Sequence, residues 1–243
     1  MGISIRHVFW CSATLSLGAF VYVMALEPID PVRNPRAGAL NRIPSRQMLI
    51  GQVRRALAEG QMSRADRLSD ELLGQNPEDL AAMFYRAIVS RALGHDDEAG
   101  EFWAVLSDQM ESLDSWTNRY SMAELSYFRG WAMIGTGRIE AGRSAFMDLS
   151  DTLEARSKNK DGQILDPGVH YNLACYRAMG GQPERAMEHW RASVENGYGQ
   201  GLSGDGGWWM VDPDLEVLHS DDRFWVIGSV LLSGGERERR QGG

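Results

Sequence analysis

The sequence predicts an all-α protein, a right-handed helical-repeat solenoid of about four helix pairs preceded by one transmembrane or signal helix. Three observations predict it. A frame of small and aromatic residues recurs between positions 46 and 198, a Gly divides each copy into two helical halves, and an uncharged run, Val8–Leu26, precedes the first copy. Because a unit of this kind cannot bury its apolar face alone, neighbouring copies are expected to stack.

The copy at Tyr171–Val194 shows the frame most clearly, as two short helices joined at Gly180-Gly181. Its frame is a small residue, a Gly seven positions later, an Ala five later and an aromatic four later: Ala174, Gly181, Ala186 and Trp190. Small residues let two helices approach closely, and the aromatic side chain fills the space between units.

The other copies keep these offsets. They are Ala87, Gly94, Ala99, Trp103 and Leu106; Gly130, Gly137, Gly142, Phe146 and Leu149; and, more weakly, Val53, Gly60, Ala65, Ser69 and Leu72. Successive frame glycines lie 34, 43 and 44 residues apart, so the last two links carry insertions. Over residues 46–198 the chain resembles bacterial tetratricopeptide repeat proteins, whose unit is a helix–turn–helix of about 34 residues. The resemblance implies a solenoid in which the first helix of each pair lines a concave groove.

Residues 1–26 are predicted to be a transmembrane anchor or a signal peptide. As a helix rising about 1.5 Å per residue, the uncharged run would nearly cross the ~30 Å hydrocarbon core of a bilayer. The predicted membrane residues are Val8, Phe9, Trp10, Leu15, Leu17, Phe20, Val21, Val23 and Leu26. Small residues near Ala25 also suit cleavage of a signal peptide, so both interpretations stay open.

The charges beside this run disagree about its orientation. Arg6 before it and Glu27 after it favour export of the C-terminal part, whereas four arginines between positions 33 and 46 favour the cytoplasm. The basic, apolar and small-residue order is the more specific signal, so we expect the bacterial inner membrane with the repeat domain on the periplasmic side. The alternatives are a soluble periplasmic protein cleaved near Ala25 and a domain facing the cytoplasm.

The next elements follow from local composition. Repeated Pro makes residues 27–45 a linker. The predicted helices are Arg46–Glu59 with Met62–Leu73, Leu80–Leu93 with Asp96–Leu106, Ser121–Ile134 with Ile139–Ala155, and the two halves of Tyr171–Val194. Ser107–Arg119 lies outside the frame, and Arg156–Gly168 is predicted to be an exposed loop.

Beyond the repeats, residues 199–233 are predicted to form a Gly-rich connector and a C-terminal capping segment, with a disordered tail at 234–243. Residues 199–204 match G-x-G-x-x-G, but no βαβ unit surrounds them, so no nucleotide site is predicted. The stretch from Trp208 to Phe224 is similar to a tail that often follows the last tetratricopeptide unit and covers its apolar face. Asp212 and Asp214 are interpreted as turn caps.

Composition excludes several classes of function. The formal net charge of −8 argues against a general nucleic-acid binder. The histidines show no zinc-ligand spacing, and the two cysteines, Cys11 and Cys175, make no pair in sequence; Cys175 is predicted to be a small core residue. We therefore expect no catalytic residue, no metal and no cofactor.

The resemblance implies which side chains face the groove. These are Ile50, Arg54, Phe84, Ile88, Arg91, Tyr127, Trp131, Ile134, Tyr171 and Cys175, and the predicted partner-binding residues among them are Arg54, Phe84, Ile88, Arg91, Tyr127, Trp131 and Tyr171. Aromatic and Arg side chains often carry binding energy at interfaces, although a stripe of this kind also suits a core.

The predicted function is that of a membrane-tethered protein–protein interaction module. It would bind a peptide or partner subunit, itself membrane-associated, in the concave groove. The alternative is a fixed accessory or structural subunit of a larger membrane protein complex. A third hypothesis, an enzyme with a site between the Gly-rich connector and the Asp-rich tail near Trp208, also stays open.

Overall fold

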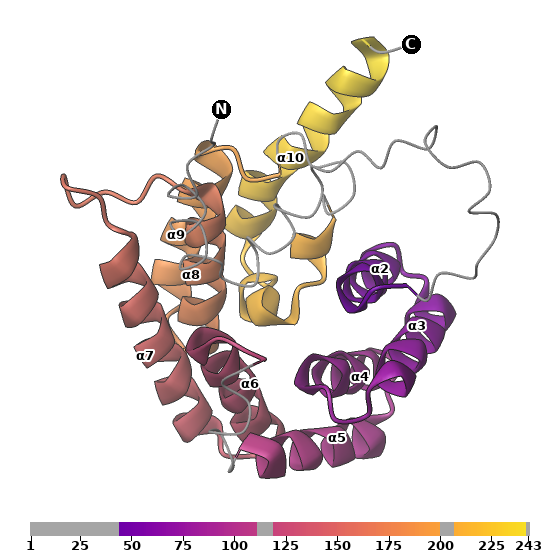
Figure 1. Ribbon diagram of the computed structural model, residues 1–243. Coiled ribbons are helices and arrows are strands. Elements are labelled where there is room, and N and C mark those ends of the chain that lie inside the picture. The colour runs from indigo at the N-terminus through magenta and orange to yellow at the C-terminus, as the bar shows by residue number, and fades with distance from the viewer. Residues whose placement is uncertain (1–43, 111–118, 200–206, 242–243) are drawn as a thin grey trace, which may run out of the picture.

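The computed structural model describes residues 44–110, 119–199 and 207–241 (Figure 1). Within these ranges the regular elements are all helical. They are α2 (Arg46–Ala58), α3 (Met62–Gln75), α4 (Leu80–Ala92), α5 (Asp96–Gln109), α6 (Met122–Gly135), α7 (Ile139–Ser157), α8 (Pro167–Met179), α9 (Pro183–Glu195), the 3-10 helices η3 (Trp208–Met210) and η4 (Pro213–Leu218), and α10 (Asp222–Gln241).

The first eight of these helices pack as consecutive pairs. Each helix contacts its pair partner most, and α3 then packs on α4, α5 on α6 and α7 on α8. The pairs form an arc, with the 3-10 helices and the start of α10 on its inner side (Figure 1). This is a tetratricopeptide-like helical-repeat fold, so the predicted fold class is confirmed at that level.

The frame glycines make the turn inside each pair. Gly60, Gly94, Gly137 and Gly181 have φ values of +67°, +78°, +83° and +77°, in the left-handed region that favours Gly. In the last pair, the Gln182 N–H donates to the Arg177 carbonyl at 2.8 Å, which closes the helix end as a Schellman turn. Four equivalent turns at the predicted positions confirm the register of the repeats.

The small frame residues lie where paired helices approach each other. A Cβ added to Gly142 on α7 would lie 2.8 Å from the Gly130 carbonyl oxygen and 2.6 Å from Ile134 Cγ1, both on α6. The α6–α7 pair is therefore too close for the Ala that the other units carry at this position. The Ile134 side chain lies against α7, so its predicted place in the groove is wrong.

The first pair lacks a frame aromatic and uses an ion cluster instead. Ser69 is fully buried, and its hydroxyl accepts a hydrogen bond from Arg86 Nη1 at 3.2 Å. The same guanidinium forms ion pairs with Asp66 at 2.5 Å and Glu98 at 2.6 Å. Arg86 thus joins α3, α4 and α5.

Several predicted boundaries differ from those observed, most of them by one to three residues. The loop assigned to Arg156–Gly168 is shorter at both ends, because α7 runs to Ser157 and α8 begins at Pro167. Pro suits the first position of a helix, and Asp166 caps it by accepting from Gly168 N at 2.7 Å. Helix α5 continues to Gln109. The backbone of α10 is helical to Gln241, within the stretch 234–243 where the sequence predicted disorder; Glu and Arg there are good helix formers. Residues 242–243 lie outside the described residues.

The predicted membrane run, Val8–Leu26, lies outside the described residues, as does most of the linker at 27–45. None of the helices in the described ranges is long and apolar enough to cross a bilayer. The linker ends at Ser45, whose hydroxyl caps α2 by accepting from Met48 N at 3.2 Å, as expected.

Candidate functional site

The inner side of the arc is occupied by the chain's own residues 208–218, which we call the groove segment. Its first part, η3, contacts α2, and its second part, η4, contacts α8 and α9. Helix α10 then packs on α9. There the side chains of Trp190, Trp209 and Phe224 meet with ring centroids 5.4 Å apart. The tail therefore covers the last repeat, as expected, and also enters the groove.

Two carboxylates of the groove segment accept hydrogen bonds from donors on two different repeats. The Tyr171 hydroxyl on α8 donates to Asp212 Oδ2 at 2.6 Å. On α6, the Tyr127 hydroxyl lies 3.1 Å from each oxygen of Asp214, and the Trp131 indole N–H donates to Asp214 Oδ1 at 2.8 Å. Neutral donors thus hold both acidic groups at fixed positions.

Two arginines contact the groove segment at its ends. The Arg54 guanidinium of α2 lies 4.4 Å from the centroid of the Trp208 ring, a cation–π contact. At the rim, Arg91 of α4 forms an ion pair with Glu216 at 2.8 Å. The Arg54 contact is buried and the Arg91 pair is exposed, so the first holds the segment more strongly than the second.

The electrostatics of this site follow from its burial. Asp212 and Asp214 are only 4% and 5% exposed. Desolvation raises the pKa of Asp212, and desolvation together with repulsion from Asp212 raises the pKa of Asp214 well above its usual range. Burial, followed by the two carboxylates, also raises the pKa of the Cys175 thiol well above its ordinary value. The Asp212–Asp214 pair is therefore more stable when it binds a proton or another cation than when both carboxylates are charged and uncompensated.

A small cavity remains between the groove and this segment. Its volume is about 40 Å³, and its walls include Arg54, Phe84, Cys175, Asp212 and Asp214. A buried water needs roughly 10–15 Å³ of such space, so the cavity has room for a few water-sized groups. Polar atoms and aromatic rings both line it.

No protein-family model matches the chain, and no curated protein matches it. Among solved structures the chain is similar to MamA 41-end from Desulfovibrio magneticus RS-1. The two share 14% sequence identity over 84% of this chain and 100% of that chain, at a TM-score of 0.30. Similarity at that TM-score is too low to support an inference about this chain, so its fold and site rest on its own geometry.

The structure brings the seven predicted partner-binding residues to one surface. Arg54, Phe84, Ile88, Tyr127, Trp131 and Tyr171 are buried, and Arg91 lies at the rim. Of these, Arg54, Arg91, Tyr127, Trp131 and Tyr171 contact the groove segment, and Phe84 and Ile88 line the cavity. Binding of a separate protein by these residues stays a prediction.

The candidate site residues that sequence reasoning did not bring to the groove are Asp212 and Asp214, whereas Cys175 was already expected to face it. Asp212 does cap η4, since its Oδ1 accepts from Asp214 N at 3.1 Å, but both side chains also reach the groove. Cys175 is buried, as predicted, and it lies beside both carboxylates. The one available signal was the alternation of acidic and apolar residues over 212–218, which favours a segment with one buried side.

A second titratable pair lies apart from the groove, on α8 and α9. Nδ1 of His170 lies 3.1 Å from Nδ1 of His189, and Nε2 of His170 lies 3.0 Å from the Ile164 carbonyl oxygen. Burial, followed by the charge of His170, lowers the pKa of His189 to about 4. His189 is therefore a partly buried neutral imidazole at neutral pH.

Proposed function

We propose that this chain is a membrane-tethered protein–protein interaction module that binds an acidic segment of a partner protein in its concave groove. The observation that carries the proposal is the groove segment itself. The concave surface already binds a stretch of two short 3-10 helices with two Asp and a Glu through Tyr, Trp and Arg side chains. A partner segment with the same groups would replace residues 208–218 and use the same donors.

The groove segment lowers the affinity that such a partner can reach. A partner must displace contacts that already satisfy the groove, so its apparent affinity falls by the fraction of chains whose groove is open. The anchor proposed at the N-terminus would offset this cost by raising the local concentration of a membrane-associated partner. The proposal assigns the chain no catalytic activity.

Site-specific photo-crosslinking in the native host tests the groove. A photoreactive residue at Arg91, whose side chain is 40% exposed at the rim, is expected to capture one discrete protein. The matched control is Glu140 on α7, whose side chain is 83% exposed and lies away from the groove segment. Equal capture from both positions, or none from Arg91, would contradict groove binding.

A second candidate is a fixed accessory subunit of a larger membrane complex. It is favoured by apolar side chains left exposed on α10, where Trp225, Val226 and Val230 are 40%, 68% and 56% exposed. Capture from Val226 in fixed stoichiometry, without capture from Arg91, would select this candidate. Both variants and the Glu140 control belong in one experiment.

The membrane part of the proposal has its own test. The supporting observation is the uncharged run Val8–Leu26. We expect the full chain to stay with the membrane fraction after alkaline extraction, and protease added to spheroplasts to digest the repeat domain. An intact mass that lacks residues 1–25 would replace the anchor by a removed signal peptide. Digestion only after lysis would place the domain in the cytoplasm.

A further inference from the structure

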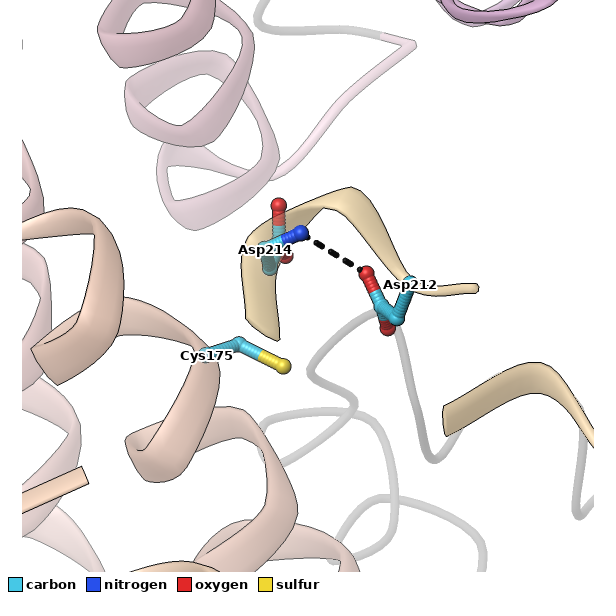
Figure 2. A group of neighbouring side chains, drawn as sticks. All are labelled: Cys175, Asp212 and Asp214. Carbon is cyan, nitrogen blue, oxygen red and sulfur yellow. Dashed lines mark hydrogen bonds between the residues drawn. The ribbon is translucent and has the colours of Figure 1, made fainter. Parts of the chain in front are cut away.

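Three potential metal ligands from two distant parts of the chain meet in the groove. Cys175 lies on α8, and Asp212 and Asp214 lie at the start of η4. One ligand atom from each residue lies within 4.8 Å of the other two. Figure 2 shows the Cys175 sulfur pointing from its helix toward the turn that carries both carboxylates. The arrangement arises only when the groove segment occupies the groove.

The thiol is the group that the rest of the fold leaves unexplained. Cys175 is 3% exposed, and it forms no disulfide within the described ranges. Its sulfur lies in the wall of the 40 Å³ cavity, and none of the side-chain hydrogen bonds described for residues 44–110, 119–199 and 207–241 joins it to another residue. As a neutral thiol it can donate at most one weak hydrogen bond to a carboxylate, whereas as a thiolate it can share a cation with both acids.

The carboxylates are already oriented as metal ligands usually are. Tyr171 holds Asp212 and Trp131 holds Asp214, and each bond leaves lone pairs on the same carboxylate free for coordination. Ligating groups in metal sites are fixed by hydrogen bonds of this kind from surrounding residues. In a tetrahedral zinc site the ligand atoms lie about 3–4 Å apart, so small movements of the three side chains would complete it.

Charge balance favours a divalent ion. Two carboxylates and one thiolate carry three negative charges, and Arg54, which lines the same cavity, carries one positive charge. A divalent cation makes this buried group neutral, which removes the cost of burying uncompensated charge. Sulfur among the ligands selects zinc-like ions over Mg²⁺ and Ca²⁺, which prefer oxygen ligands alone.

We propose that Cys175, Asp212 and Asp214 form a buried site for one thiophilic divalent cation of the zinc class. The thiolate and one oxygen of each carboxylate are the three protein ligands, and the cavity leaves the fourth position for water. The bound ion ties η4 to α8 and therefore holds the groove segment in place. The site needs no partner to form, because all three ligands belong to this chain, but a partner that displaced residues 208–218 would remove two of them.

Metal titration of the full chain tests the site. After chelator treatment and dialysis, Zn²⁺ is added and followed by calorimetry with melting in parallel; we expect one ion per chain, release of protons and a higher Tm. Cys175→Ser and Asp214→Asn, both nearly isosteric, should each weaken Zn²⁺ binding by at least about tenfold. His189→Gln is the matched control. It removes one imidazole of the His170–His189 pair, which could bind Zn²⁺ elsewhere in the chain, and it should leave the affinity of the proposed site unchanged.

A Co²⁺ spectrum of the wild-type chain keeps the proposal testable if a variant fails to fold. Cobalt bound by Cys175 should give a thiolate-to-cobalt charge-transfer band, which added Zn²⁺ abolishes. The absence of that band, absence of Zn²⁺ binding, or binding that persists in Cys175→Ser and is lost in His189→Gln would each overturn the proposal.

Discussion

The indole N–H of Trp131 on α6 donates to Asp214 Oδ1 on η4 at 2.8 Å, across 83 residues of sequence. Trp131 also stacks on Trp103 of α5, with ring centroids 5.6 Å apart and planes 13° apart. One side chain therefore joins the packing between two repeats to the segment that fills the groove. For this reason the repeat stack and its C-terminal segment are expected to unfold together.

Tyr171→Phe should destabilise the fold by about 1–3 kcal/mol, since it leaves the buried Asp212 carboxylate without one donor. The loss comes from the hydroxyl, because the ring stays stacked on Tyr198 at a centroid distance of 4.3 Å. Chemical denaturation followed by circular dichroism measures the change. Tyr176→Phe is the control: Tyr176 is also a buried residue, but its hydroxyl takes part in none of the hydrogen bonds described for residues 44–110, 119–199 and 207–241, so a smaller effect is expected. Equal effects from the two variants would contradict a role for the Tyr171–Asp212 bond.

Gly142→Ala should destabilise the protein by about 1–3 kcal/mol, as overpacked sites do. Three other units have Ala at this position, and helix propensity alone would predict a gain of up to about 1 kcal/mol. The close contact with the Gly130 carbonyl oxygen reverses the sign, because backbone cannot move aside as a side chain can. Gly51→Ala on α2 is the matched control, since no atom lies within 4 Å of its added Cβ, and it should be neutral or stabilising.

The repeat architecture could be predicted from the sequence because its determinants are local. Frame glycines five residues before a small residue define a turn, and the predicted turn residues Gly60, Gly94, Gly137 and Gly181 all adopt positive φ. Helix ends were less predictable. Pro167 looked like part of a loop, whereas it begins α8, because the same residue suits both a turn and a first helical position.

The candidate site was only half predictable. The groove side of it follows from the tetratricopeptide resemblance, which implies that Tyr127, Trp131 and Tyr171 lie on inner helices. The position of the groove segment was not predictable, because it is held by contacts between residues 41 to 87 positions apart, such as Tyr171 with Asp212 and Tyr127 with Asp214. A periodic pattern in the sequence does not show which distant residues will meet. The local capping bond of Asp212 already explained an acid at that position, so there was no reason in the sequence to look for a second role.

Stability should fall as the pH drops from about 6.5 toward about 4, because His189 has a lowered pKa in the folded chain. In this pH range His189 binds a proton in the unfolded chain but not in the folded chain, so protonation favours unfolding. Above that window both states are neutral at His189 and its contribution is constant. The charged groups around it are His170, Glu154, Arg177 and Arg185.

The measurement is Tm against pH for the wild type and for His189→Gln. The wild-type curve should drop more steeply on the acid side, and the difference between the curves isolates His189 from His219, whose pKa is also lowered by burial. Parallel curves would contradict the assignment.

Arg86→Met should destabilise the first two repeats in a way that salt relieves. The guanidinium lies within 3.2 Å of an oxygen of Asp70 and closer to Asp66 and Glu98, so its removal leaves three acids together without a cation. We expect a loss on the order of 2 kcal/mol at low ionic strength, less than for a fully buried pair because the acids are partly exposed. Added salt should recover part of it by screening the repulsion among them.

Arg223→Met provides the matched comparison for this charge effect. Arg223 also binds two acids, Glu184 at 2.9 Å and Asp221 at 2.6 Å, but its side chain is 50% exposed. Solvent screens exposed ion pairs, so this variant should unfold close to the wild type at every salt concentration. If Arg86→Met were equally mild, or if salt did not change its effect, Ser69 and its neighbours would hold the first pair by packing alone.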